Sequence, residues 1–368
     1  MVGIGSAAVR APVDFGPQGG DPRRRRDGVH LDLSTCVNRY GPPPAAKAAL
    51  LDLAPSDMQV HPYDATERMA SVYAAHLGVD AHQLVVGRGT TEFIWALGRR
   101  VSHRDVAVPL PAYTDYLKAF PGRGFAGSRP APVPTLGLVD EALGHARLVI
   151  LSNPHNPTGV ALPPDALVRL ASRHPRSVLV VDESYADFVP DPSALTVIGC
   201  DATNVVALRS PSKFYGIAAT RVGVAWAADG SWLRRLLGPR ETWPVSGLDV
   251  AVATAAMSDR AWAEESRRGL VADGRWLADA LVPLVDTSGP RARLVTDAPV
   301  HYRCLLTPAA DSLAAAFAAR GLGVRALGRA HGVDPGALRV LAPLVHERAA
   351  VADIIAAVAG VDAMLATG

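Results

Sequence analysis

The sequence predicts an α/β fold, in which a large domain with a mixed, mostly parallel sheet is joined to a smaller α+β domain. Three observations lead to this prediction. Between residues 83 and 227, short Val-, Ile- and Leu-rich segments alternate with helical ones, as strands buried on both faces do. From about Ser246 a long helical stretch precedes several short strands. The 368 residues suffice for one large and one smaller core.

The sequence predicts an N-terminal arm followed by a large domain. Residues 1–45 are rich in Gly, Pro and Arg, which predicts an irregular arm that packs with the small domain. A large domain is expected over 46–245, where a helix at 67–78 ends on Gly78. Further helices are predicted at 90–101, 113–120 and 164–174. Strands are predicted at 83–87, 105–110, 147–152, 177–183, 204–210 and 221–227.

A small domain is expected over 246–368. Its first part, residues 248–284, has helical spacing throughout. Helices are predicted at 311–321 and 347–365, and strands at 292–296, 300–307, 323–327 and 338–343.

Composition limits the function classes. The net charge of +2, with 49% hydrophobic and 20% charged residues, is that of an ordinary globular protein, so neither nucleic acid nor a membrane is expected as a partner. The three cysteines, Cys36, Cys200 and Cys304, are scattered and show neither a disulfide framework nor zinc-ligand spacing. No metal site is therefore expected. Since the N-terminus also shows no signal-peptide pattern, the expected location is cytoplasmic.

Two stretches at strand ends contain candidate ligand-binding residues. In VGRGTTEFIWAL, Gly89, Thr90 and Thr91 open a helix and offer backbone N–H groups and hydroxyls to a phosphate. The alternative is a glycine turn with a threonine cap. In LSNPHNPTGV, Asn156 is suited to hold a polar ligand atom with its amide, or else it only forms a turn.

A third stretch, VLVVDESYADF, delivers Asp182 to the end of an apolar strand. A carboxylate buried there must be paired. A protonated pyridine nitrogen would satisfy it; the alternative is a salt bridge to a neighbouring arginine. Tyr185, three residues later, is placed to donate a hydrogen bond to a phenolate oxygen.

The fourth stretch, ALRSPSKFYGIAATRVGVAWA, contains Lys213 among small and hydroxyl residues. A deprotonated lysine forms a Schiff base, and burial near other cations favours deprotonation. Ser210, Ser212 and Arg221 are suited to bind a phosphate, Arg221 through a planar fork that lysine lacks. The four stretches in this order describe a pyridoxal-phosphate site.

With these motifs, the chain resembles the fold-type I pyridoxal-phosphate enzymes of the class I/II aminotransferase family, in the branch of histidinol-phosphate aminotransferases and threonine-phosphate decarboxylases. The resemblance extends from LDLSTCVNRYGPP to LRVLAP. It implies that Lys213 carries the cofactor as a Schiff base and that Asp182 pairs with the ring nitrogen. It also implies that Asn156 and Tyr185 hydrogen-bond the phenolic oxygen, and that Thr90, Thr91, Ser210, Ser212 and Arg221 bind the phosphate.

The resemblance implies further roles. Tyr113 would stack on the ring, and Tyr63, in HPYDAT, would reach the phosphate of a neighbouring subunit, because the family works as homodimers with shared sites. Arg339 would grip a substrate carboxylate and Asn38 would lie near the substrate. His301 stands where the family's small domain has an asparagine, and it is either a substrate-binding residue or an ordinary strand histidine.

The substrate half departs from both branches. Gln18 stands where the decarboxylases have a histidine, and Pro343 where they have a second arginine. Arg39 replaces the proline of the aminotransferase arm. The run Arg23–Arg26 is expected to be a solvated loop or to attract an anionic substrate.

The predicted function is a PLP-dependent aminotransferase that acts on an amino acid or amine with a 2-oxo acid partner. The alternatives are a decarboxylase or other α-carbon chemistry such as cyclisation. A cofactor-binding regulator is disfavoured, because no DNA-binding domain is expected before residue 30 and Lys213 is present.

Overall fold

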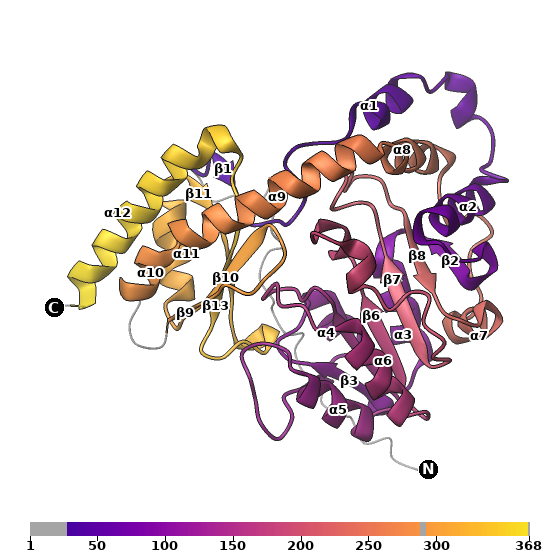
Figure 1. Ribbon diagram of the computed structural model, residues 1–368, viewed down its shortest axis with the longest axis horizontal. Coiled ribbons are helices and arrows are strands. Elements are labelled where there is room, and N and C mark those ends of the chain that lie inside the picture. Colours follow the sequence, from indigo (N-terminus) through magenta and orange to yellow (C-terminus); the bar gives the residue numbers. More distant parts are fainter. Residues whose placement is uncertain (1–27, 288–291, 367–368) are drawn as a thin grey trace, which may run out of the picture.

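The computed structural model describes residues 28–287 and 292–366, so Gln18 and Arg23–Arg26 lie outside the described residues (Figure 1). Its largest sheet has seven strands in the order β2-β8-β7-β6-β5-β3-β4. Strand β8 runs antiparallel to both of its neighbours and the other pairs are parallel, so the sheet is mixed and mostly parallel as predicted. In chain order the strands are β2 (Leu84–Gly87), β3 (Val106–Pro109), β4 (Gly124–Phe125), β5 (Leu148–Ser152), β6 (Val178–Asp182), β7 (Val205–Arg209) and β8 (Gly223–Trp226).

Both faces of this sheet are buried. Side chains alternate between the faces of a strand, so Leu179 and Val181 of β6 belong to one apolar cluster and Val180 to another. One face packs against α3 (Gly89–Arg100), α4 (Thr114–Ala119) and α7 (Gly230–Leu237). The other packs against α2 (Ala65–Leu77), α5 (Leu136–His145), α6 (Pro164–Arg173) and α8 (Gly247–Ser258). Burial on both faces explains why these strands read as continuous apolar runs.

A four-stranded antiparallel sheet in the order β12-β13-β10-β9 follows along the chain. Its strands are β9 (Arg293–Val295), β10 (Tyr302–Leu306), β12 (Arg325–Leu327) and β13 (Ala337–Leu341). The accompanying helices are α9 (Arg260–Ala280), α10 (Val282–Thr287), α11 (Ala310–Ala318) and α12 (Arg348–Ala366). The stretch with continuous helical spacing is thus three helices, α8, α9 and α10, and the Asp259 carboxylate caps α9 by accepting from the Trp262 amide at 3.1 Å. Figure 1 shows α9 reaching from α8 to α10.

The N-terminal arm is more regular than predicted. Strand β1 (Leu31–Asp32) pairs in parallel with β11 (Leu322–Gly323), and α1 (Pro44–Leu51) begins inside the predicted arm. A two-residue strand whose partner is almost 300 residues away leaves no periodic signal in the sequence, which is why the prediction was wrong here. The pairing does join the arm to the C-terminal half of the chain. The division into the three segments 1–45, 46–245 and 246–368 stays a prediction.

The remaining elements are short. Single turns of 3-10 helix occur at Pro55–Met58, Ala81–Gln83, His103–Asp105, Ala186–Phe188, Pro192–Leu195, Arg329–His331 and Val345–Glu347. Within the described residues, none of the helices has the length and apolar character needed to cross a bilayer. The same part of the chain contains no cluster of His, Cys, Asp or Glu side chains arranged to hold a metal ion.

Candidate active site

The predicted site residues gather at the carboxyl ends of β5, β6 and β7. Ser152 of β5 lies beside Asp182 of β6, and Asp182 beside Leu208 of β7. Because parallel strands end at the same edge, the turns that follow them converge there. These turns carry Asn156, Tyr185 and Lys213.

A cavity of about 170 Å³ opens at this edge. Five predicted site residues line it: Tyr113, Asn156, Tyr185, Lys213 and Arg339. The lining also takes in the arm segment 34–37 and three residues of the C-terminal half, Arg325, Leu327 and His331, and no carboxylate is among the lining residues that the structure describes. The cavity is therefore cationic and joins distant parts of the chain.

Lys213 is packed among aromatic rings. Its Nζ lies 4.2 Å from the centroid of the Tyr185 ring and 5.8 Å from that of Tyr113. Burial lowers the pKa of Lys213; Arg339 lowers it further, while Asp182 acts in the opposite direction. The net lowering favours the neutral amine, which is the nucleophilic and basic form.

The Asp182 carboxylate is held by neutral donors. The Tyr116 hydroxyl donates to Oδ2 at 2.8 Å, and the Ser184 amide and hydroxyl donate to Oδ1 at 3.0 and 2.5 Å. Among the described residues Asp182 forms no ion pair, so the alternative of a salt bridge to arginine is not supported; the nearby Arg209 pairs with Glu183 and Asp187 instead. A buried carboxylate without a cation suits a protonated ring nitrogen.

Two of the predicted phosphate-binding residues, Gly89 and Arg221, meet at the start of α3. Gly89 has a φ of +73°, and a Cβ there would lie 2.9 Å from Nη2 of Arg221, so the guanidinium covers the glycine. The Ser210 hydroxyl donates to the Val222 carbonyl at 2.7 Å and the Ser212 hydroxyl to that of Thr220 at 3.2 Å. These bonds fold the loop after β7 onto the chain entering β8.

The substrate side is built around Arg339 in β13. Its Nη1 donates to Asn156 Oδ1 at 2.5 Å and its Nη2 to the Ser34 carbonyl at 2.8 Å. Arg325 in β12 lies directly opposite Arg339 in the antiparallel pair. Like charges directly opposite each other destabilise a sheet, so the pair suggests a place for an anion.

Besides the cofactor-side residues described above, the predicted residues Asn38, His301 and Tyr63 also lie outside the described cavity lining. The Asn38 amide donates to the Phe214 carbonyl at 2.8 Å and its backbone N–H to the Lys213 carbonyl at 2.9 Å, so it fixes the arm to the lysine loop. His301 is buried, stacks on Phe188 at 4.1 Å, and has a pKa lowered to about 3, first by burial. Tyr63 is 70% exposed.

Several cavity or cofactor-side residues were missed by sequence reasoning. Tyr116 follows Tyr113 by one helical turn, a spacing that could have marked it. Arg325 and His331 carried no such signal, because their position depends on the β12–β13 register. Burial lowers the pKa of His331 to about 4, so its imidazole is neutral at pH 7.

Comparisons with known proteins agree with this geometry. The family model of aminotransferase class I and II matches residues 29–340. A histidinol-phosphate aminotransferase of Haloferax volcanii is 34% identical over 262 residues, which is 68% of this chain and 70% of that protein. That of Dinoroseobacter shibae is 32% identical over 273 residues, with 69% and 72% covered.

Solved structures share the fold. Histidinol-phosphate aminotransferase of Sinorhizobium meliloti, in complex with pyridoxal 5'-phosphate, has a TM-score of 0.76 at 22% identity, covering 90% of this chain and 91% of that one. L-threonine-O-3-phosphate decarboxylase of Porphyromonas gingivalis has a TM-score of 0.74 at 18% identity, covering 89% and 98%.

The residues fit this cofactor. They comprise a lysine with a lowered pKa, a buried carboxylate free of any ion pair among the described residues, and a guanidinium over a glycine at a helix start. Together with the family match, this means that the chain belongs to the class I and II aminotransferase family and is a PLP-dependent aminotransferase of fold type I.

Proposed function

We propose that this enzyme transfers the amino group of an anionic amino acid or amine to a 2-oxo acid, with Lys213 as the catalytic base. The observation that carries the proposal is the position of the Lys213 amine, 4.2 Å from the Tyr185 ring in a cavity also lined by Asn156 and Arg339. Relatives named histidinol-phosphate aminotransferases support transamination.

The cofactor and the site residues are proposed to have separate roles in the reaction. Bound pyridoxal phosphate supplies the carbonyl that takes up the amine and a ring that withdraws electrons from the α-carbon. The Lys213 Nζ accepts the α-proton and returns it, as its lowered pKa allows. Asp182 would hold the ring nitrogen protonated, Asn156 and Tyr185 would orient the phenolic oxygen, and Tyr113 would cover the ring.

The anionic group of the substrate is proposed to lie between Arg325 and Arg339. These side chains come from facing positions of β12 and β13, and both line the cavity. Pro343 stands where the decarboxylases have a second arginine, and Arg325 would supply a second guanidinium from another strand. Anions compete well for paired guanidinium groups because two N–H bonds form at once.

A panel experiment tests this function. Holoenzyme is mixed with neutral and anionic amines, including phosphorylated and dicarboxylic amino acids, and products are identified. We expect a 2-oxo acid or aldehyde and the aminated acceptor. Carbon dioxide release without amino transfer would contradict the proposal. In Arg325→Gln, KM for an anionic substrate should rise about tenfold or more with kcat less affected, whereas Arg329→Gln, outside the lining, serves as the control.

We further propose that the active unit is a homodimer with shared sites. Exposed apolar side chains are concentrated between α1 and Tyr63, among them Leu51 and Met58. His61 stacks on Trp243 at 4.0 Å within this region. An exposed apolar surface of this kind is typical of a protein interface. A dimer formed through this surface would place Tyr63 at the active site of the partner subunit.

Mixing two inactive variants tests the shared site. Lys213→Ala and Tyr63→Phe, refolded together, should regain activity, because a hybrid dimer contains one site with both native residues. Sedimentation should show a dimer that Met58→Glu dissociates. A monomer at all concentrations, or a mixture without regained activity, would contradict the arrangement.

A further inference from the structure

A chain of hydroxyl groups connects the start of α3 with Asp182. Thr90 Oγ1 lies 3.2 Å from Ser184 Oγ, and Ser184 Oγ lies 2.5 Å from Asp182 Oδ1. All three side chains are at most 8% exposed. Ser184 thus connects a predicted phosphate-binding residue to the carboxylate that is proposed to pair with the ring nitrogen.

The donor and acceptor at each step of this chain can be assigned. An ionised carboxylate only accepts, so the Ser184 hydroxyl donates its one hydrogen to Asp182. Ser184 then has only lone pairs left for Thr90, and Thr90 must be the donor in their bond. The single hydroxyl hydrogen of Thr90 is therefore used on Ser184, and it is not available to a phosphate, which also only accepts.

The same carboxylate is fixed from its other side. Tyr116 donates to Oδ2, and burial raises the pKa of Tyr116 well above its usual value, with Asp182 acting in the same direction, so Tyr116 keeps its hydrogen. With the Ser184 amide, three neutral donors hold the two oxygens. Rotation of the carboxylate would break these bonds, so its orientation toward a ligand is set before the ligand binds.

We propose that Ser184 is a positioning residue that fixes Asp182 toward the cofactor ring, and that the Thr90 hydroxyl belongs to this chain and not to the phosphate site. The backbone N–H groups at the start of α3 remain for the phosphate. The assignment rests on the proposed function in one respect, the role of Asp182 at the ring nitrogen. It changes the role that sequence reasoning gave to Thr90.

Cofactor binding separates the two roles of Thr90. The dissociation constants of pyridoxal phosphate and of pyridoxal, which lacks the phosphate, are measured for each variant apoenzyme. In Thr90→Val and Ser184→Ala, the dissociation constant of pyridoxal divided by that of pyridoxal phosphate should stay at its native value. In Arg221→Gln, the matched control, this ratio should fall. If Thr90→Val reduces the ratio as Arg221→Gln does, Thr90 is a phosphate ligand and the proposal is wrong.

The pH dependence of the visible absorbance of the bound cofactor tests the effect on Asp182. Loss of a donor leaves more negative charge on Asp182, which raises the pKa of the neighbouring Lys213 group, so the midpoint should move up in Ser184→Ala and in Thr90→Val. Thr90→Ser, which keeps the hydroxyl, should restore the native midpoint. For Ser184→Ala we expect kcat/KM to fall about tenfold or more.

The outcomes are separable. If Ser184→Ala leaves the midpoint unchanged, or if the shifts of the two single variants simply add in the double variant, the chain does not act as a unit and the proposal fails. Lys213→Ala tests the proposed function independently. A variant of Lys213 that keeps transamination overturns that function without reference to Ser184.

Discussion

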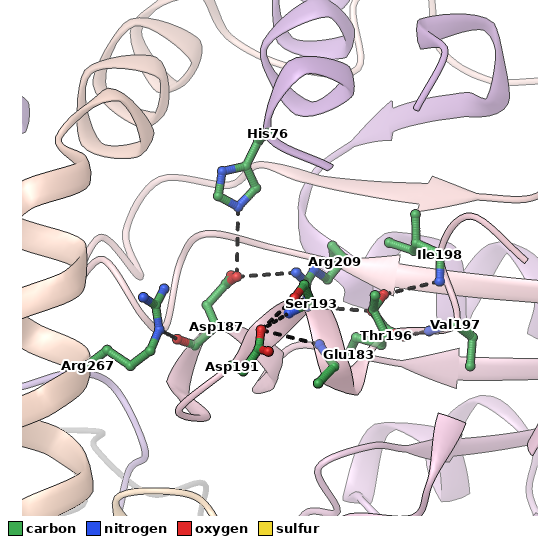
Figure 2. A network of polar contacts seen from close by, with 11 residues as sticks. His76, Glu183, Asp187, Asp191, Ser193, Thr196, Val197, Ile198, Arg209 and Arg267 are labelled. Atoms are coloured by element: carbon green, nitrogen blue, oxygen red, sulfur yellow. Dashed lines mark hydrogen bonds and ion pairs between the residues drawn. The ribbon is translucent and has the colours of Figure 1, made fainter. Parts of the chain in front are cut away.

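Replacing Arg209 with leucine is expected to lower the free energy of unfolding by about 3–5 kcal/mol. Arg209 is 3% exposed, and its Nη1 lies 3.5 Å from Glu183 Oε2 while its Nη2 lies 3.3 Å from Asp187 Oδ1 (Figure 2). Without the guanidinium, two buried carboxylates lose their shared cation. Glu183 keeps its bonds from the Thr196 hydroxyl and the Val197 amide, both at 2.7 Å, which do not neutralise its charge.

The surface pair of Arg173 and Asp140 provides the control. Arg173 Nη2 lies 3.2 Å from Asp140 Oδ1, but the side chains are 61% and 39% exposed. Arg173→Leu should therefore cost less than about 1 kcal/mol. Urea unfolding of both variants at pH 8 gives the comparison. Equal losses would mean that the buried pair contributes no more than a solvated one.

The loss should also depend on pH. Burial raises the pKa of Glu183 from 4.5 to about 7, although Arg209 acts to lower it. Because the folded-state pKa lies above the unfolded one, ionising Glu183 removes stability as the pH rises between those values. Removing Arg209 raises the folded-state pKa of Glu183 further, and that of Asp187, which is now about 2, rises as well. The loss in free energy of unfolding caused by Arg209→Leu should thus be larger at pH 8 than at pH 5.

This ion network lies next to the site. Glu183 follows Asp182 at the end of β6, and Arg209 precedes Ser210 at the end of β7. The network ties the two strand ends together directly behind the cofactor residues, so destabilisation there is expected to weaken cofactor binding too.

Features that depend on neighbouring residues could be predicted from the sequence, and features that depend on distant contacts could not. The strands of the large sheet and the residues Asn156, Asp182 and Lys213 follow from local patterns, an apolar run and then a polar turn. The parallel arrangement then brings the turns together without further information.

The parts that were missed depend on register or on distant partners. Arg325 reaches the cavity because it pairs with Arg339 across β12 and β13, and this register is not visible in either segment. For His301 the sequence left two alternatives, a substrate-binding residue or an ordinary strand histidine, and its stacking on Phe188 outside the described cavity lining favours the second. The arm asparagine, Asn38, bonds backbone atoms 176 residues away, which no local pattern indicates.

Replacing Lys213 with alanine is expected to lower kcat by about 10⁴-fold or more, because one amine both holds the cofactor and transfers the proton. The visible absorbance of bound cofactor should be lost as well. The chain has only three lysines, Lys47, Lys118 and Lys213, so the attachment point can be identified without ambiguity. Reduction of the holoenzyme with borohydride, followed by peptide mass mapping, should find the cofactor on Lys213 alone.

Lys47→Ala is the control, since Lys47 is exposed on α1. It should keep both the absorbance and the turnover. Added methylamine should partly restore turnover to Lys213→Ala if the missing group acts as a base in the cavity, and should leave Lys47→Ala unchanged. Cofactor found on Lys118, or full turnover in Lys213→Ala, would contradict the mechanism, because the lowered pKa of Lys213 and its place over the Tyr185 ring would then have no part in the chemistry.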